Sequence, residues 1–195
     1  MAEEEEALIA RSRGGDVNAF NLLVERYQRM VYSVVFRMLG HRQEAEDVTQ
    51  EAFLSAFQGV ARFRGGSFRA WLLRIAANAC YDHLRFRRRR PTVSLDVLES
   101  ESGNPLPGHI ASPEEHVLRG ELARLIEEGL GQLPEEQRLA VVLCDVQGFS
   151  YEEAAEATRS SLGTVKSRLS RGRARLRDFF KEHRELLPSL YRHRT

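Results

Sequence analysis

Hydrophobic positions in the first ninety residues recur at the three- and four-residue spacing of amphipathic helices. One stripe runs through residues 20–38, and Gly40 follows it as the expected stop. A second stripe runs through residues 45–56. A third runs through residues 72–84 and follows Ser67, whose side chain can cap a helix. The polar–apolar alternation typical of strands is absent from the sequence, so we expect an all-α fold.

The C-terminal half repeats the helical pattern with clearer start signals. Residues 112–115 and 150–153 are capping boxes, Ser-Pro-Glu-Glu and Ser-Tyr-Glu-Glu. Leu-Pro-Glu-Glu-Gln at residues 133–137 opens another helix, which Gly148 should end. A short helix, a tight connection and a longer helix from about Ser161 then predict a helix-turn-helix.

The segment from Pro91 to Glu115 separates these two blocks and is rich in proline, serine, glycine and acidic residues. It has no sustained period, which is typical of a flexible linker. We expect two small helical domains, residues 1–90 and 114–183, joined by a linker at 91–113 and followed by a tail at 184–195. The apolar residues of the tail fit packing on the second domain or contact with a partner, and both readings stay open.

Composition narrows the class of protein. With 42% hydrophobic residues the chain can bury a core, but no apolar run approaches the roughly 20 residues of a membrane span. The N-terminus is acidic, unlike a secretory signal. The two cysteines, Cys80 and Cys144, lie far apart and offer no disulfide framework. These features predict a cytoplasmic protein with no membrane insertion of its own.

The net charge of +1 hides an uneven distribution. No acidic residue occurs from Arg159 to Arg177, a stretch that holds seven basic residues, and Arg85 with residues 87–90 forms a second basic cluster. Two basic patches on a nearly neutral chain indicate local contact with a polyanion. For residues 87–90, contact with duplex phosphates and a solvated start of the linker both stay open.

The last helix of the helix-turn-helix has the face of a DNA-reading helix. A rotation of about 100° per residue gathers its apolar positions on one side: Val165, Leu169, Gly172 and Leu176. The opposite side and its flanks carry small and basic residues: Lys166, Ser167, Arg168, Ser170, Arg171, Arg173, Ala174 and Arg175. Small side chains let a backbone approach the major groove, while arginines reach guanine edges and phosphates. Solvated helix faces normally mix charge signs, so the absence of acidic residues favours the DNA reading.

Four motifs, in this order, resemble the extracytoplasmic-function (ECF) group of the sigma-70 family of RNA polymerase sigma factors. They are AEDVTQEAFLSAF (45–57), FRGGSFRAWLLRIAANACYDHLR (63–85), LPEEQR (133–138) and GFSYEEAAEATRSSLGTVKSRLSRGRARL (148–176). The resemblance covers nearly the whole chain and implies the family's domains 2 and 4. It implies a signal- or stress-responsive initiation factor without catalytic activity or cofactor. The implied partners are the β′ clamp helices and β flap of core polymerase, promoter DNA (duplex at −35, single-stranded at −10) and an anti-sigma factor.

The resemblance assigns docking on core polymerase to the second helical stripe. The residues concerned are Glu44, Asp47, Gln50, Glu51 and Phe53. Their acidic face suits a basic partner, although without the resemblance an ordinary solvated face would be the better interpretation.

The resemblance assigns −10 recognition to the loop after residue 62 and the helix that follows. A flipped base needs a stacking surface and the single strand needs cationic support. The candidates are Phe63, Arg64, Ser67, Phe68, Trp71, Arg74, Asn78, Tyr81 and Arg85. Phe68 and Trp71 also fit a role in the core, and that alternative stays open.

Recognition of the −35 duplex falls on the final helix by both the resemblance and the helical rotation. The candidates are Thr164, Lys166, Ser167, Arg168, Ser170, Arg171, Arg173 and Arg175. Ser170 stands where relatives often carry a bulky residue, which leaves the exact −35 sequence open.

Other classes of protein fit less well. Cys80 and His83 share a helix face, but no second pair of ligands has recognisable spacing, so no metal site is expected. A phosphate-binding loop and a nucleophile elbow are missing, which argues against an enzyme. A stand-alone helix-turn-helix regulator explains the C-terminal half but leaves the N-terminal motifs without a role. A protein-binding adaptor leaves both basic patches unexplained.

Overall fold

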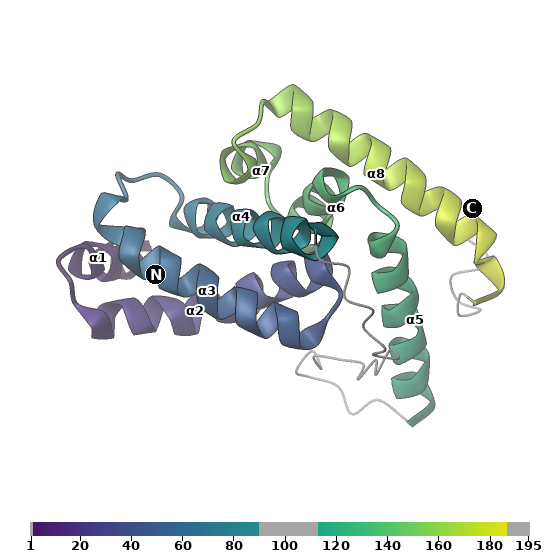
Figure 1. Ribbon diagram of the computed structural model, residues 1–195, viewed down its shortest axis with the longest axis horizontal. Helices are drawn as coiled ribbons and strands as arrows, with labels where there is room; N and C mark the ends of the chain where they lie inside the picture. Colours follow the sequence, from purple (N-terminus) through teal and green to yellow (C-terminus); the bar gives the residue numbers. More distant parts are fainter. Residues whose placement is uncertain (1, 90–112, 187–195) are drawn as a thin grey trace.

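The computed structural model describes residues 2–89 and 113–186, and every regular element within these ranges is helical (Figure 1). The predicted all-α fold is confirmed. The helices are α1 (Ala2–Arg13), α2 (Val17–Leu39), α3 (Arg42–Gly59), η1 (Val60–Arg62), α4 (Phe68–Arg89), α5 (Pro113–Gly131), α6 (Glu135–Val141), η2 (Val142–Val146), α7 (Tyr151–Thr158), α8 (Leu162–Glu182) and η3 (Arg184–Leu186).

Some expectations fall outside the described ranges: Arg90, almost all of the linker with the Ser112 cap, and the tail beyond Leu186. Among the described helices, none combines the length and apolar character needed to cross a membrane.

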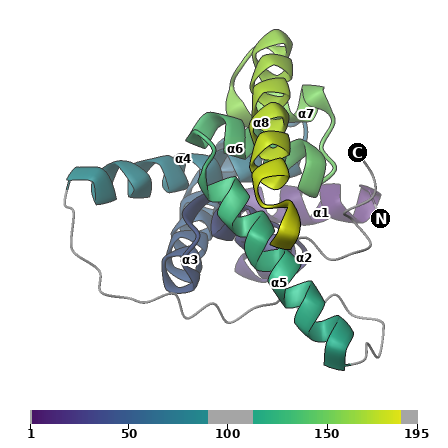
Figure 2. The ribbon, with the colours of Figure 1, turned by 90° about the vertical axis from the view of Figure 1, so that its right-hand side faces the viewer.

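Helix α4 lies between the two halves of the molecule. It packs on α2 and α3 on one side and on α7 on the other. Figures 1 and 2 show α7 and α8 on the opposite side of α4 from α1 and α3, while α5, α6 and η2 contact α2 directly. The buried apolar residues of both halves form one continuous cluster, from Leu8 in α1 to Leu169 in α8. The two halves therefore meet through a packed interface.

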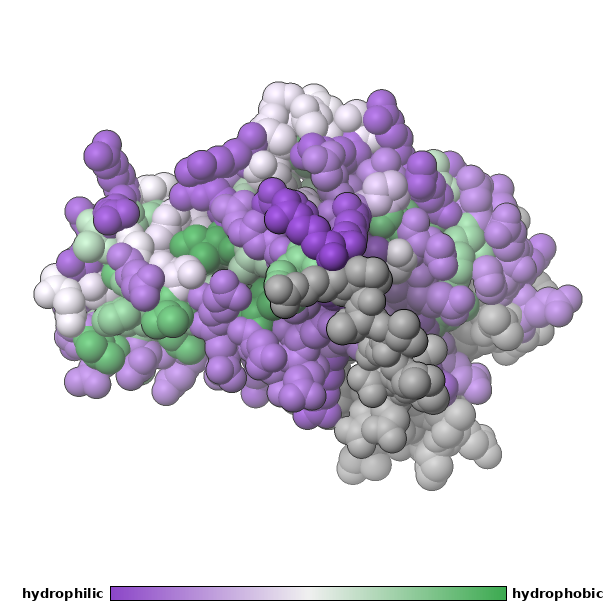
Figure 3. Space-filling view, viewed as in Figure 1, coloured by the Kyte–Doolittle hydropathy of each residue, from purple (hydrophilic) through white to green (hydrophobic). Residues whose placement is uncertain are grey.

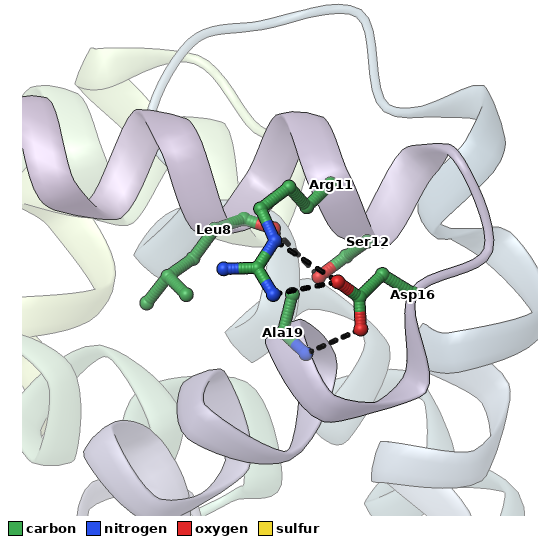
Figure 4. A network of polar contacts seen from close by, with 5 residues as sticks. All are labelled: Leu8, Arg11, Ser12, Asp16 and Ala19. Carbon is green, nitrogen blue, oxygen red and sulfur yellow. Dashed lines mark hydrogen bonds and ion pairs between the residues drawn. The ribbon is translucent and has the colours of Figure 1, made fainter.

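The corner between α1 and α2 is fixed by one carboxylate (Figure 4). Asp16 is the N-cap of α2 and accepts a hydrogen bond from the Ala19 N–H at 3.1 Å, while Arg11 donates to its other oxygen at 2.7 and 2.9 Å. The Ala19 N–H bond, and then Arg11, lower the pKa of Asp16. The Ser12 hydroxyl donates to the Leu8 carbonyl at 2.7 Å, so this buried group is satisfied. The sequence analysis assigned no element to this segment.

The predicted helix boundaries are confirmed where they rest on local caps. Gly40 adopts φ 77° and donates its N–H to the Phe36 carbonyl at 2.7 Å, which ends α2. The Ser67 hydroxyl accepts from the Ala70 N–H at 3.1 Å and starts α4. Ser150 and Glu153 form the complete capping box of α7.

Helix α6 continues into the π turn η2 before the chain reaches the helix-turn-helix. The Gln147 N–H donates to the Val142 carbonyl at 3.0 Å, an i to i+5 bond that adds one residue to the turn. Gly148 then leaves the helix at φ 68°. The predicted stop at Gly148 is confirmed, while the π turn before it was not expected.

Arg138 joins the C-terminal half to the end of α2. Its guanidinium donates to the carbonyl of Met38 at 2.6 Å and to the carbonyls of Gly131 and Leu133 at 2.6 and 3.2 Å. Burial lowers the pKa of Arg138, and nearby acidic groups oppose that shift. The C-terminal carbonyls of a helix carry partial negative charge, which favours a cation at this position.

Arg69 of α4 makes another polar contact across the interface. It donates to the Gln147 carbonyl at 2.6 Å, and its guanidinium carbon lies 3.6 Å from the centre of the Phe149 ring. The Gln147 side chain donates in turn to the Ser33 hydroxyl of α2 at 2.8 Å. Residues 147–149 therefore contact both α2 and α4.

Candidate nucleic-acid interface

Helix α8 buries the side that the sequence predicted. Val165 and Leu169 are 2% exposed, and Gly172 is buried against α6. A Cβ added at Gly172 would lie 2.8 Å from the Val141 side chain, so glycine permits this close packing of α8 on α6. The packing of α8 on α6 therefore fixes which side of α8 faces solvent.

The exposed side of α8 is basic, and the flank of it beside Tyr151 of α7 is concave. Its exposed candidates are Lys166, Ser170, Arg171, Arg173 and Arg175, whereas Thr164, Ser167 and Arg168 are half-buried. A cavity of about 430 Å³ opens on this face, and the residues that line it are Tyr151, Lys166, Leu169, Ser170, Arg173, Ala174 and Arg177. Three cations thus lie around the small side chains of Ser170 and Ala174, an arrangement that suits a phosphate-bearing duplex.

Arg168 differs from the other basic residues of α8. Its side chain forms an ion pair with Glu136 at 2.6 Å and is 24% exposed. It also lines a second, smaller cavity together with Tyr81 of α4. In this structure Arg168 therefore faces α4 and α6, away from the concave face of α8.

Three −10 candidates meet at a crevice between α4 and the helix-turn-helix. This cavity of about 120 Å³ is lined from α4 by Arg74, Asn78 and Tyr81, and from the other side by Arg159 and Arg168 among others. Burial, and then the positive charge of Arg159, lower the pKa of Arg74. Burial, and then Glu136, raise the pKa of Tyr81 to about 12. Asn78 remains exposed, while Arg74 and Tyr81 are half-buried.

The three aromatic candidates of the −10 loop lie in the core. Phe63, Phe68 and Trp71 are 6%, 3% and 9% exposed, and their ring centres lie 5.3 to 5.5 Å apart. Their expected stacking surfaces are therefore covered by one another in this structure. The three rings pack together beneath the loop, because burying the large apolar area of aromatic rings stabilises the fold.

The remaining −10 candidates occupy exposed or capping positions. Arg64 is exposed, Ser67 caps α4, and Arg85 forms an ion pair with Asp82 at 2.5 Å. Figure 3 shows the most hydrophilic side chains of its view gathered over the C-terminal end of α4, where the arginine run lies. There, Arg87 pairs with Glu44 at 3.0 Å.

Helix α3 presents part of the expected acidic face to solvent. Asp47, Gln50 and Glu51 are exposed, and Leu54, which the sequence analysis missed, is 59% exposed on the same face. Glu44 points to α4 instead, where it contacts Arg87 and the His83 ring at 3.2 Å. Phe53 is half-buried and packs on the core.

Comparison with known proteins assigns both halves to one family. The model of "Sigma-70 region 2" matches residues 23–90, and that of "Sigma-70, region 4" matches residues 123–176. The RNA polymerase sigma-H factor of Pseudomonas aeruginosa is 39% identical over 88% of this chain and 91% of its own length. The ECF RNA polymerase sigma-E factor of Escherichia coli is 41% identical over 89% of this chain and 93% of its own length.

The chain belongs to the ECF group of sigma-70 factors. It is thus an RNA polymerase sigma factor, a DNA-binding factor of transcription initiation.

Two solved structures resemble this sigma factor over most of its length. CnrH in complex with the cytosolic domain of CnrY matches with a TM-score of 0.68 and 28% identity, covering 92% of this chain and 98% of CnrH. The sigma factor RpoE of Bartonella quintana, in complex with the anti-sigma factor NepR, matches with a TM-score of 0.65 and 30% identity, covering 85% and 98%.

Some surface residues of this sigma factor were missed by the sequence analysis. Tyr151 and Arg177 line the concave face of α8, and Leu54 adjoins the acidic face of α3. Arg177 was visible as part of the basic run, and Tyr151 follows the Ser150 cap directly, but nothing in the sequence indicated that they share one cavity. Cys80 is buried and His83 faces Glu44; no group of three possible metal ligands occurs in the described ranges.

Proposed function

We propose that the concave face of α8 recognises the −35 promoter duplex. The cavity ringed by Lys166, Arg173 and Arg177, with Ser170 and Ala174 between them, is the observation that carries the proposal. Cations at the rim meet phosphates, and a floor of small side chains lets the helix approach the base edges. The proposed contact residues are Thr164, Lys166, Ser167, Ser170, Arg171, Arg173 and Arg175. Arg168 joins them only after its side chain has released Glu136 and the C-terminal half has left α4.

Capture of the opened −10 strand falls to α4 and the loop before it. Arg64 and Arg74 supply positive charge, Asn78 offers an amide to a base edge, and Tyr81 offers a ring. Since Phe63, Phe68 and Trp71 are packed together, their role in this proposal is to support the loop from below.

Docking on core polymerase falls to the exposed face of α3. Asp47, Gln50, Glu51 and Leu54 lie at helical spacing on one side, with two carboxylates around an apolar side chain. A basic partner surface such as the β′ clamp helices complements this face. The domain that carries α8 docks on the β flap in the same assembly.

The packed arrangement has a direct consequence for strand capture. Arg74 and Tyr81 lie against the helix-turn-helix, so a single strand reaches them only after α4 and α7 separate. Binding to polymerase supplies the energy for that separation in this proposal. The complexes of CnrH and RpoE with protein partners support an anti-sigma factor as a further partner here, and a sigma factor of this kind acts in the cytoplasm, where the polymerase is.

In-vitro transcription from a promoter library tests the proposal, with core polymerase in the presence and absence of this protein. Discrete, protein-dependent start sites that share −35 and −10 elements are expected. Absence of such transcripts, together with duplex binding by the protein alone, would instead support a stand-alone helix-turn-helix regulator. A second test compares transcription from a fully paired promoter with transcription from the same promoter with a mismatched −10 region. The mismatched DNA is already open, so its two strands need not be separated.

A further inference from the structure

Asp145 of the π turn η2 forms an ion pair with Arg173 on the concave face of α8. Its two carboxylate oxygens accept hydrogen bonds from the Nε and Nη2 of Arg173 at 3.0 and 2.5 Å. This is the two-pronged geometry in which a planar guanidinium is held in one orientation. Asp145 belongs to the π turn η2, which lies between α6 and α7.

The fork does not use all of the guanidinium. Arginine has five N–H donors, of which Asp145 engages two, and Arg173 also lines the cavity. The hydrogen bonds to Asp145 come first among the causes that raise the pKa of Arg173, and the Tyr151 hydroxyl adds to that shift. Arg173 is therefore held at the rim of the cavity by Asp145 of η2, and Tyr151 of α7 lines the same cavity.

An acidic group beside a DNA-reading face needs an explanation, because it repels phosphate. The side chain of Asp145 is 34% exposed and that of Arg173 is 51% exposed, so the pair lies at the surface. The pair is electrically neutral, which reduces the long-range attraction that Arg173 alone would exert on DNA. Lys166 and Arg171, by contrast, have no acidic partner among the residues that the structure describes. What the pair retains is a fixed orientation of the Arg173 guanidinium.

We infer that Asp145 is a positioning residue for −35 recognition: it orients Arg173 before DNA arrives and so increases discrimination between −35 sequences. The inference rests on the proposed role of α8. A free arginine loses rotamer freedom when it binds, whereas a guanidinium already fixed in a fork loses less. Neutralising its charge at the same time weakens contacts with DNA that does not match.

The test uses the holoenzyme and a promoter selected from a library by the unmodified protein, beside the same promoter with a scrambled −35 element. For Asp145→Asn we expect discrimination between the two DNAs to fall about fivefold to tenfold. We also expect the plot of log affinity against log salt to steepen by about one unit, because Arg173 becomes a free cation. Asp145→Glu keeps the fork chemistry and should restore most of the discrimination.

Asp178→Asn is the matched control, since it removes one carboxylate from the exposed surface of α8 itself. It should leave discrimination unchanged. In an Arg173→Ala background, Asp145→Asn should cause no further loss of discrimination, because the group that it orients is gone. This cycle also separates positioning from stability, since a loss through unfolding would persist without Arg173.

Two results would overturn the inference. The first is unchanged discrimination in Asp145→Asn, which includes an equal gain of affinity for both DNAs. The second is a loss of the same size in the Arg173→Ala background. Failure of the proposed function is distinguishable, because the unmodified holoenzyme itself would then show no dependence on the −35 element.

Discussion

Arg69→Ala should open the interface between α4 and the C-terminal half. The substitution removes the hydrogen bond to the Gln147 carbonyl at 2.6 Å and the contact with the Phe149 ring at 3.6 Å. A hydrogen bond from a charged donor contributes about 1.5–3 kcal/mol, and a cation–π contact about 0.5–2 kcal/mol. Because Arg69 is only half-buried, we take about 2 kcal/mol for both together, near the lower limit of the sum.

That free energy applies to the closed state alone. The contact of Arg69 with the Met30 sulfur lies within the N-terminal half and is common to open and closed molecules, so its loss cancels. About 2 kcal/mol corresponds to roughly a 30-fold change in the closed-to-open ratio. A protein that is closed in a ratio of about 99 to 1 would fall to about 3 to 1.

Single-molecule energy transfer between dyes on α3 and α8 measures this ratio. Gln58 and Lys181 are exposed sites for labelling, and Cys144→Ser leaves only the buried Cys80 as a further thiol. A low-transfer population should appear in Arg69→Ala. Arg62→Ala removes an exposed arginine of η1 and serves as the matched control. Equal open fractions in the two variants would refute the assignment of Arg69 to the interface.

Three further outcomes are expected. Arg171→Ala should cost about 1–3 kcal/mol of promoter binding and relax selection at one −35 base, as read from a promoter library; an equal loss on every −35 sequence would indicate a phosphate contact. Asp47→Lys should abolish co-purification with core polymerase while thermal unfolding stays unchanged, and normal assembly would remove α3 as the docking face. Burial raises the pKa of Cys80 and of Tyr81 to about 12, so both stay protonated in the fold while the unfolded chain ionises from about pH 9. The free energy of unfolding, complete below that pH, should therefore fall towards pH 12 in urea titrations, and a flat profile would contradict the burial of these groups.

The elements predicted best are those whose signals are local. Ser67, Gly40 and the capping box at Ser150 act within four residues of their own positions, so the sequence alone indicates where these helices begin and end. Helix α1 was missed because an acidic run dominates it and only Leu8 and Ile9 supply its buried apolar side. Two apolar positions are too few to show the repeat of an amphipathic helix.

No comparable local signal in the sequence predicts the interface between the two halves. Arg138 contacts the backbone carbonyl of Met38, one hundred residues away, and a carbonyl is present at every position of the chain. Aromatic residues posed a related difficulty: Phe63, Phe68 and Trp71 have the chemistry of a stacking surface and of a core, and only packing decides between the two. The helical rotation gave the buried side of α8 correctly, but not the helices that its flanks contact.

The concave face of α8 is open in the same structure in which Arg74 and Tyr81 lie half-buried against the helix-turn-helix. If the two surfaces bind DNA as proposed, the closed arrangement leaves the surface for duplex exposed and covers the surface for single strands. The free molecule would then keep a weak, salt-sensitive affinity for duplex, which would retain it near the chromosome. The surface for unpaired strands would stay covered at replication forks and transcribed genes. Strand capture would thus be restricted to the place where polymerase separates α4 from α7.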